Sequence, residues 1–200
     1  MRTEQTAATK AAWRDGNRAL PALSLSILLS SLGTSIANVG LPGIATSFAV
    51  PFAQVQWVVL AYLLATTTLI VGAGRLGDRI GRRGLLLGGI LLFTLASALC
   101  GLAPSLPLLI AARALQGLGA AAMMAMSMAL VGGIVDKART GRAMGMLGSM
   151  SAVGTALGPS LGGGAVALAG WPALFLVNVP LGLVALLLVR TLVPDRKSVV

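Results

Sequence analysis

The chain has 200 residues, of which 56% are hydrophobic and 10% are charged, and it carries a net charge of +10. Soluble domains carry about 25% charged residues, so this composition excludes an ordinary soluble protein and indicates an integral membrane protein. The chain contains no histidine, which excludes Ser-His and Cys-His catalytic pairs and histidine-ligated metal sites. We therefore expect no enzyme, no catalytic residue, no metal and no cofactor.

The basic residues lie in clusters between apolar runs, and this arrangement indicates the kind of partner. Such clusters are typical of the loops that flank membrane spans, whereas a basic face without apolar runs is typical of a nucleic-acid-binding protein. We therefore predict a lipid bilayer as the partner and no nucleic acid.

Six apolar runs are long enough to cross the bilayer, which needs about 20 residues of helix. A basic cytoplasmic tail over residues 1–19 precedes them, and a short charged end over 194–200 follows. The sequence thus predicts an all-α, multi-pass protein of the cell membrane, with six transmembrane helices in one bundle. The predicted helices cover about 20–39, 55–73, 85–103, 106–135, 143–168 and 172–193.

The distribution of lysine and arginine predicts the orientation of these helices. Fourteen of the fifteen lie in the tail, between helices 2 and 3, between helices 4 and 5, or at the C-terminal end. With six spans all of these segments lie on one side, and basic loops face the cytoplasm. We therefore expect both termini in the cytoplasm.

The remaining basic residue, Arg113, lies within the fourth run. A charge in mid-membrane costs about 2.5–3.5 kcal/mol on insertion scales, so such a residue usually faces the protein interior or a wet cavity. The alternative is an arginine whose long side chain reaches back to the membrane surface.

Residues 74–84 interrupt the second and third runs with four arginines, four glycines and one acid, Asp78. A segment of this composition cannot lie in hydrocarbon, because its polar groups would have no partners there. It therefore predicts a tight, hydrated turn between two membrane helices.

The first predicted helix carries a polar face, because Ser24, Ser31, Ser35 and Asn38 are spaced by seven, four and three residues. Such a face either lines a wet cavity or makes hydrogen bonds to a neighbouring helix. Methionines in the fourth helix suit either a cavity or the filling of core gaps. The third and sixth helices are the most evenly apolar and are expected to face lipid. Candidates for a substrate cavity are therefore Ser31, Ser35, Asn38, Met124 and Met128.

The fifth predicted helix combines regularly spaced glycines with a proline. Gly154, Gly158 and Gly162 recur every four residues, which permits close approach of a neighbouring helix. Pro159 has no N–H, so the helix is expected to kink there. Together with Gly163 these residues predict a hinge that bends or rocks, and the alternative is static, tight packing.

Three of these patterns, in this order, resemble the major facilitator superfamily. Residues 74–83 are similar to its loop signature, residues 113–120 to its helix 4 motif, and residues 154–163 to the helix 5 motif of its antiporters. The end of the first helix, 38–42, and the start of the sixth, 171–182, look like the fourteen-helix drug:proton antiporter family. The resemblance extends over nearly the whole chain.

The resemblance implies one six-helix half of a transporter, built from two inverted repeats of three helices each. It also implies alternating access around a cavity lined by helices 1 and 4, and efflux of small apolar or cationic drugs driven by the proton gradient. In such a transporter Asp78 latches against a helix N-terminus of the second half, where a negative charge is favoured, and Arg113 and Gln116 assist proton coupling. The implied gate loop comprises Gly74, Gly77, Asp78, Arg79, Gly81, Arg82 and Arg83.

One departure from that family concerns charge. Its members usually carry an aspartate in helix 1 where this chain has Gly33, and all five acidic residues of this chain lie in predicted tails or loops. Proton antiport normally needs a carboxylate within the membrane. Coupling would therefore have to use a carboxylate elsewhere.

The other departure is length, because the family has twelve or fourteen spans and this chain has six. The chain is expected to be the N-terminal half of an exporter of small molecules, truncated at its end, whose partner is a missing half of six to eight helices. A second alternative is a half-size subunit that pairs with itself or with another subunit to form the pore. A third is a non-transporting membrane protein, such as a remnant or an assembly partner.

Overall fold

The computed structural model describes residues 2–193, with side chains from Arg18 onward except that of Val71. The predicted charged end, 194–200, lies outside the described residues. Within residues 2–193 the chain is helical with no strand, and six helices are long and apolar enough to cross a membrane. The predicted all-α fold with six spans is therefore confirmed. These spans are Arg18–Phe48, Phe52–Ile70, Arg82–Gly101, Leu106–Ile134, Lys137–Ala169 and Ala173–Leu192.

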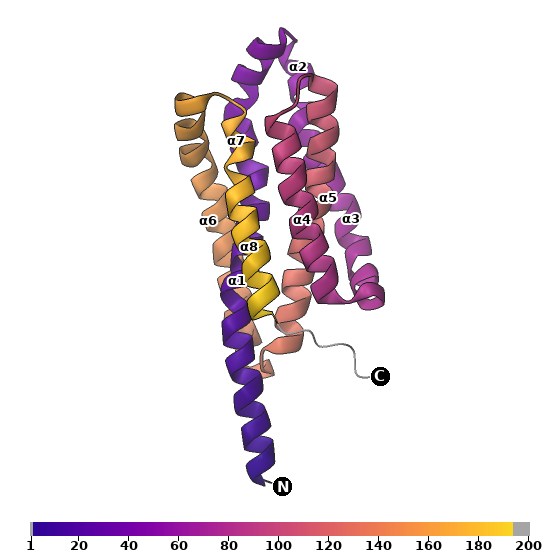
Figure 1. Cartoon of the computed structure of the whole chain (residues 1–200), viewed down its shortest axis with the longest axis vertical. Coiled ribbons are helices and arrows are strands. Elements are labelled where there is room, and N and C mark those ends of the chain that lie inside the picture. The colour runs from indigo at the N-terminus through magenta and orange to yellow at the C-terminus, as the bar shows by residue number, and fades with distance from the viewer. Residues whose placement is uncertain (1, 194–200) are drawn as a thin grey trace.

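The helices form one elongated bundle (Figure 1). The beginning of the first helix and the end of the last lie at the same end of this bundle, as an even number of crossings requires (Figure 1). In chain order the elements are α1 (Arg2–Phe48), α2 (Phe52–Val55), α3 (Trp57–Ile80), α4 (Arg82–Gly101), α5 (Leu106–Ile134), α6 (Lys137–Ala169), α7 (Ala173–Leu176) and α8 (Asn178–Leu192).

The packing of the helices follows an internal repeat. Helix α1 packs on α6, α5 and α8, while α5 packs on α3, α1 and α4. The first three spans correspond to the last three in order. Under this correspondence the α1–α6 contact matches the α5–α3 contact, the α1–α8 contact matches the α5–α4 contact, and the α1–α5 contact matches itself. Two close approaches between helix backbones obey the same exchange, because a Cβ added to Gly154 of α6 would meet Leu28 O of α1 and one added to Gly117 of α5 would meet Tyr62 O of α3. The predicted architecture of two three-helix repeats is confirmed.

The first helix is longer than predicted at both ends. It begins at Arg2, within the predicted tail, and it continues through Pro42 to Phe48 instead of ending near residue 39. At about 1.5 Å per residue it is about 70 Å long, far more than the hydrocarbon core of a bilayer. Its second extension is held by tertiary packing, since Leu41 and Ile44 are buried in a cluster that includes Leu174 and Phe175.

The predicted turn over residues 74–84 is much shorter in the structure. Helix α3 continues to Ile80 and α4 starts at Arg82, so Gly81 alone separates them. Gly81 has a φ of 93°, a conformation that side-chain-bearing residues rarely adopt. Gly74, Gly77 and Asp78 therefore lie on the last turns of α3 rather than in a loop.

Two other predicted boundaries also differ. Helix α6 starts at Lys137, six residues earlier than predicted, so only Val135 and Asp136 connect it to α5. The predicted sixth helix is interrupted at Val177 into α7 and α8. Pro180 has no N–H to offer the carbonyl of Leu176, which weakens the helical hydrogen bonding at that point.

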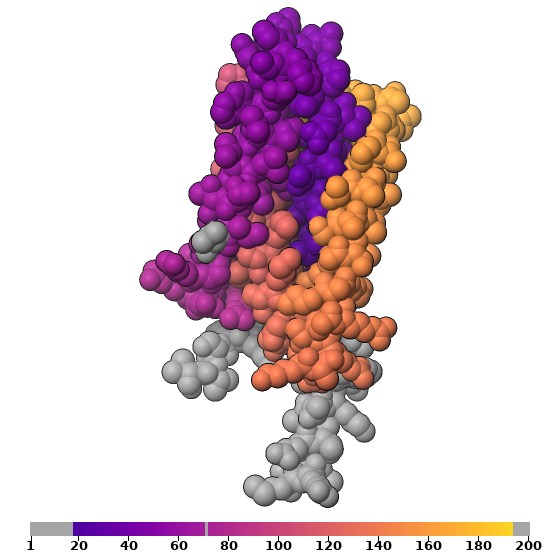
Figure 2. Space-filling view, turned by 180° about the vertical axis from the view of Figure 1, so that it is seen from behind, coloured from indigo at the N-terminus to yellow at the C-terminus, as the bar shows by residue number. Residues whose placement is uncertain are grey.

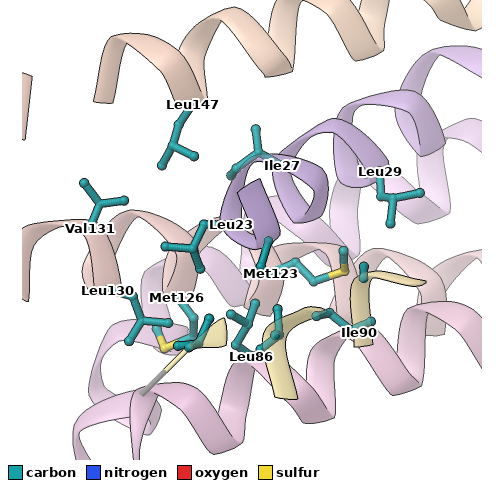
Figure 3. Packing of buried hydrophobic residues seen from close by; sticks show 14 of the residues in the cluster. Leu23, Ile27, Leu29, Leu86, Ile90, Met123, Met126, Leu130, Val131 and Leu147 are labelled. Carbon is teal, nitrogen blue, oxygen red and sulfur yellow. The ribbon is translucent and has the colours of Figure 1, made fainter. Parts of the chain in front are cut away.

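Two hydrophobic clusters fill the interior, one toward each end of the bundle. The first includes Leu23, Ile90, Met123 and Leu147, which come from four different helices (Figure 3). The second includes Ile36, Val58, Leu109 and Phe175, again from four helices. Each cluster thus joins both three-helix repeats, and the bundle forms one body.

The evenly apolar third and sixth helices are not the least buried ones. Half of the α4 span and a third of the α7–α8 span are buried, compared with 22% of the second span and 17% of the fifth. Glycines explain the burial of α4, because Gly89 and Gly119 bring the backbones of α4 and α5 into contact. The outward sides of α4 and α8 are nevertheless lined by exposed leucines. We call this surface the outer leucine face; it comprises Leu91, Leu95, Leu99, Leu183 and Leu187.

Candidate functional site

Among the described side chains Arg113 is the largest that is completely buried, and it lies where the two hydrophobic clusters meet. Its Nε donates a hydrogen bond to Val58 O of α3 at 2.9 Å. Its Nη1 donates to Gly33 O of α1 at 3.1 Å and to the side-chain oxygen of Gln116, one turn further along α5. The guanidinium therefore connects the backbones of three helices. This confirms the prediction that Arg113 faces the protein interior rather than the membrane surface.

Polar neighbours extend this network to a fourth helix. Gln116 Nε2 donates to Ser97 Oγ of α4 at 2.7 Å, and Ser97 in turn donates to Phe93 O. Tyr62 of α3 donates its hydroxyl hydrogen to Ser30 O of α1 at 2.7 Å. We refer to Arg113, Gln116, Ser97 and Tyr62 as the Arg113 network.

The guanidinium of Arg113 is flanked by aromatic rings and not by a carboxylate of the described residues. The guanidinium carbon lies 4.2 Å from the centre of the Tyr62 ring and 5.6 Å from that of Phe175. A desolvated cation–π contact is worth about 2 kcal/mol. None of the five acids of the chain lies within the six spans that the structure describes. Arg113 Nη2 makes no hydrogen bond with the described residues, so the network holds a buried charge that is only partly compensated.

Gly33 occupies the position where the resemblance leads one to expect an aspartate. A Cβ at this position would lie 3.2 Å from the Phe93 ring and 3.3 Å from Tyr62 Oη. A side chain there is therefore crowded unless these rings shift. The carbonyl of Gly33 accepts a hydrogen bond from Arg113, so a backbone dipole rather than a carboxylate of this residue contacts the guanidinium.

The serines of the polar face of α1 are used for packing against α6. Ser31 Oγ lies 2.7 Å from Ser151 Oγ, and Ser35 Oγ donates to Gly154 O at 3.4 Å. Both serines are buried, whereas Asn38 is exposed. In this structure Ser31 and Ser35 therefore belong to the α1–α6 interface, and of the three only Asn38 lies on an open surface.

The regularly spaced glycines of α6 face α1, as their spacing predicts. A Cβ at Gly154 would lie 2.6 Å from Leu28 O, one at Gly158 would overlap Ser35 Oγ, and one at Gly162 would lie 3.2 Å from Ile36. The two helices are thus in backbone contact over two turns.

The other two residues of the predicted hinge point elsewhere. Pro159 and Gly163 are exposed, and a Cβ at Gly163 would meet no atom within 4 Å. Helix α6 is continuous through Pro159. Helix α6 therefore has two distinct faces. The three glycines form the face that packs against α1, and Pro159 and Gly163 lie on an exposed face.

A strip of α1 and α5 is left without a covering helix between α3 and α6. Thr34 and Asn38 lie on α1 between its contacts with α5 and with α6, and Met124 and Met128 lie on α5 between its contacts with α1 and with α3. Thr34 and Met124 are half-buried, while Asn38 and Met128 are exposed. Figure 2 shows this side of the molecule, with α3 along one edge, α6 along the other, and α1 and α5 between them. We call these four residues the α1–α5 strip.

The residues of the implied gate loop gather at the basic end of the bundle. Arg82 Nη2 lies 3.1 Å from Asp78 Oδ1, and Arg82 Nη1 donates to Ala129 O at the end of α5. Gly77 packs against the Met126 side chain, so α3 and α5 approach closely there. Asp78 is thus already held by an arginine of this chain. Gly74 and Arg79 are exposed on the last turns of α3, Arg82 is exposed, and Arg83 is half-buried on the first turn of α4.

Sequence reasoning missed two members of the Arg113 network, Tyr62 and Ser97. Tyr62 is the single tyrosine of the chain, and Ser97 is one of few polar residues in an otherwise apolar helix. Either could have been singled out as an unusual residue within a span. Nothing in their spacing, however, indicates that they meet a residue of α5.

The profile of the Major Facilitator Superfamily matches residues 23–199. The chain is 35% identical over 166 residues to the riboflavin transporter RibZ of Clostridioides difficile (strain 630), a match that covers 83% of this chain and 36% of that protein. It is 44% identical over 170 residues to the multidrug resistance protein Stp of Mycobacterium tuberculosis (strain CDC 1551 / Oshkosh), a match that covers 84% of this chain and 32% of that protein. The chain therefore spans about a third of the length of these relatives.

Solved structures show the same fold. A bacterial homologue of the human lysosomal transporter Spinster, inward-facing and occupied, superposes with a TM-score of 0.82 at 18% identity, over 90% of this chain and 45% of that one. The proton:xylose symporter XylE superposes with a TM-score of 0.80 at 17% identity, again over 90% and 45%. Together with the profile match over most of its length, these similarities show that this multi-pass membrane protein belongs to the Major Facilitator Superfamily.

Proposed function

We propose that the chain forms one six-helix half of a proton-driven exporter of small apolar or cationic molecules. The exporter opens alternately to the two sides of the membrane as this half moves against a second half of six to eight helices. Two relatives support a small-molecule cargo, since one is named a riboflavin transporter and the other a multidrug resistance protein.

The difference between the two sides of the bundle is the observation that carries this proposal. The outer leucine face presents only branched aliphatic side chains, which suit the acyl chains of lipid. The opposite side presents the α1–α5 strip, with an amide, a hydroxyl and two methionines, between α3 and α6. Flexible methionines and a few polar groups suit a cavity for varied apolar cargo.

The orientation and the energy source follow from the charges. The basic end of the bundle, which carries Asp78 and the arginines around it, faces the cytoplasm. Because none of the five acids lies within the six described spans, the carboxylate that carries the coupled proton belongs to the rest of the transporter.

Transport in membrane vesicles that contain the complete protein tests this proposal. A fluorescent apolar cation is expected to leave the cytoplasmic side against its gradient, and an ionophore that collapses the proton gradient is expected to stop it. If the complete, folded protein moves neither cationic nor neutral dyes under any ion gradient, the proposal fails and the non-transporting alternative stands.

Shortening Met128 of the α1–α5 strip to alanine is expected to change which cargo is preferred. Met128 is 45% exposed on the strip, so Met128→Ala enlarges the cavity while removing little core packing. Losing part of an apolar pocket wall changes discrimination between similar ligands by about tenfold. The measurement is the ratio of transport rates for two dyes of different size. Leu95→Ala on the outer leucine face is the control, and an equal change in that variant would contradict the assignment of the strip.

Replacing Asp78 with asparagine is expected to reduce transport while leaving stability nearly unchanged. The Asp78–Arg82 pair is exposed, and exposed ion pairs contribute at most about 1 kcal/mol. Transport rate and thermal unfolding are measured on the same preparation. Asp136→Asn, another exposed acid at the same end, is the matched control. Full transport by Asp78→Asn would show that Asp78 is no latch.

A further inference from the structure

Two arginines from distant parts of the chain meet at the basic end of the outer leucine face. Arg83, on the first turn of α4, donates a hydrogen bond from Nη2 to Arg190 O at 2.8 Å. Arg190 lies on the last turn of α8, and its side chain is exposed. The hydrogen bond therefore brings two guanidinium-bearing residues together on one surface.

This surface lies at the ends of two apolar spans. The span of α4 starts at Arg82, and the span of α7 and α8 ends at Leu192, so both arginines lie at the level where the hydrocarbon of a bilayer is expected to end. Further along the two helices, away from the basic end, Leu187 and Leu91 are the first leucines of the outer leucine face. Lipid headgroups lie at this boundary, with their acyl chains along the leucines.

Next to the arginines, the described part of the chain leaves the surface of α4 uncovered. Gly84 and Gly88 are exposed, and a Cβ on either would meet no atom of the described residues within 4 Å. Two successive turns of α4 thus carry no side chain on their outward side. This leaves room beside Arg83 for a bulky group that a leucine there would exclude.

We propose that Arg83, Gly84, Gly88 and Arg190 form a binding site for the headgroup of an anionic phospholipid, which we call the Arg83–Arg190 site. Arginine recognises phosphate with a planar fork of donors, and its charge persists at any physiological pH. Beyond Gly88 the outer leucine face carries bulky leucines rather than the small residues of membrane helix–helix interfaces, which favours a lipid acyl chain there. The site is independent of which molecule the transporter carries.

Retention of lipid by the complete protein tests this site. The protein is reconstituted in nanodiscs of phosphatidylcholine with phosphatidylglycerol as the minority lipid, and lipids that remain bound after extraction are identified by native mass spectrometry. The unchanged protein is expected to enrich phosphatidylglycerol. Arg190→Gln is expected to lower that enrichment about tenfold, which corresponds to one hydrogen bond to a charged group.

Variants separate this site from general surface charge and from misfolding. Arg190→Lys keeps the charge and is expected to restore most of the enrichment, which a folding defect would not do. Lys137→Gln and Arg142→Gln remove exposed charges at the same end from α6, which packs chiefly on α1, and are expected to leave enrichment unchanged.

Three results would overturn the proposal. The first is full enrichment in Arg190→Gln, and the second is an equal loss in the α6 variants, which would indicate diffuse attraction. The third is complete release of phosphatidylglycerol by excess inorganic phosphate, which would mean that the site takes a free anion.

Discussion

Replacing Gly154 with alanine is expected to destabilise the protein by about 3 kcal/mol, near the upper end of the usual cost of overpacking. The new Cβ would lie 2.6 Å from Leu28 O and 3.2 Å from Leu32 N, both of which are main-chain atoms of α1. A main chain cannot turn aside as a side chain can, so α1 and α6 would have to separate. The measurement is thermal unfolding of the purified protein, together with its transport rate.

Two further glycines of the same helix provide graded controls. At Gly158 the nearest obstacle, Ser35 Oγ, can rotate away, but Ser35 Cβ at 2.8 Å and Ile36 N at 3.1 Å cannot, so Gly158→Ala is expected to be destabilising as well. At Gly163 a Cβ meets nothing, and alanine is the better helix former by about 1 kcal/mol, so Gly163→Ala is expected to be neutral or stabilising. Equal destabilisation at all three positions would mean that glycine is needed for flexibility of α6 rather than for its contact with α1.

Replacing Arg113 with methionine is expected to abolish transport while changing the free energy of unfolding by less than about 1 kcal/mol. The guanidinium is completely buried without a carboxylate, so its removal relieves a desolvation cost that roughly offsets the lost hydrogen bonds. Methionine is long and flexible enough to fill the space beside Tyr62 and Phe175. Transport and thermal unfolding of the same preparation separate the two effects.

Other substitutions at this position distinguish charge from volume. Arg113→Ala is expected to destabilise by about 3 kcal/mol, because it adds a cavity to the same loss of charge. Leu99→Met on the outer leucine face is the matched control for the introduced methionine. If Arg113→Met transported as well as the unchanged protein, the Arg113 network would be only structural, and if it unfolded, the hydrogen bonds to Val58 and Gly33 would be holding the bundle together.

The Arg113 network shows how far sequence reasoning could reach into the site. Arg113 and Gln116 could be paired from sequence, because residues three apart lie on one face of a helix. A buried position for Arg113 could also be predicted, since a charge within a span avoids lipid. Tyr62 and Ser97 could not be assigned to it, because they come from α3 and α4 and meet Arg113 and Gln116 only through the packing of whole helices.

The glycines of α6 show the same limit within one helix. Spacing distinguishes Gly154, Gly158 and Gly162 as a set that permits close packing, and in the structure all three pack against α1. The polar face of α1 was ambiguous, because a serine suits a cavity and a helix interface equally well. Only the position of α6 decided that Ser31 and Ser35 are interface residues and that Asn38 is open.

Local chemistry was sufficient for the number of spans, their order and the end of the bundle that carries the basic residues. Each of these depends on runs of apolar or charged residues within one segment, and the energy of transferring a segment into lipid is a property of that segment. Tertiary structure decided how far each helix extends, which face of it is covered, and which residues surround Arg113. Those outcomes depend on contacts between segments that can be more than a hundred residues apart, whose energies no single segment contains.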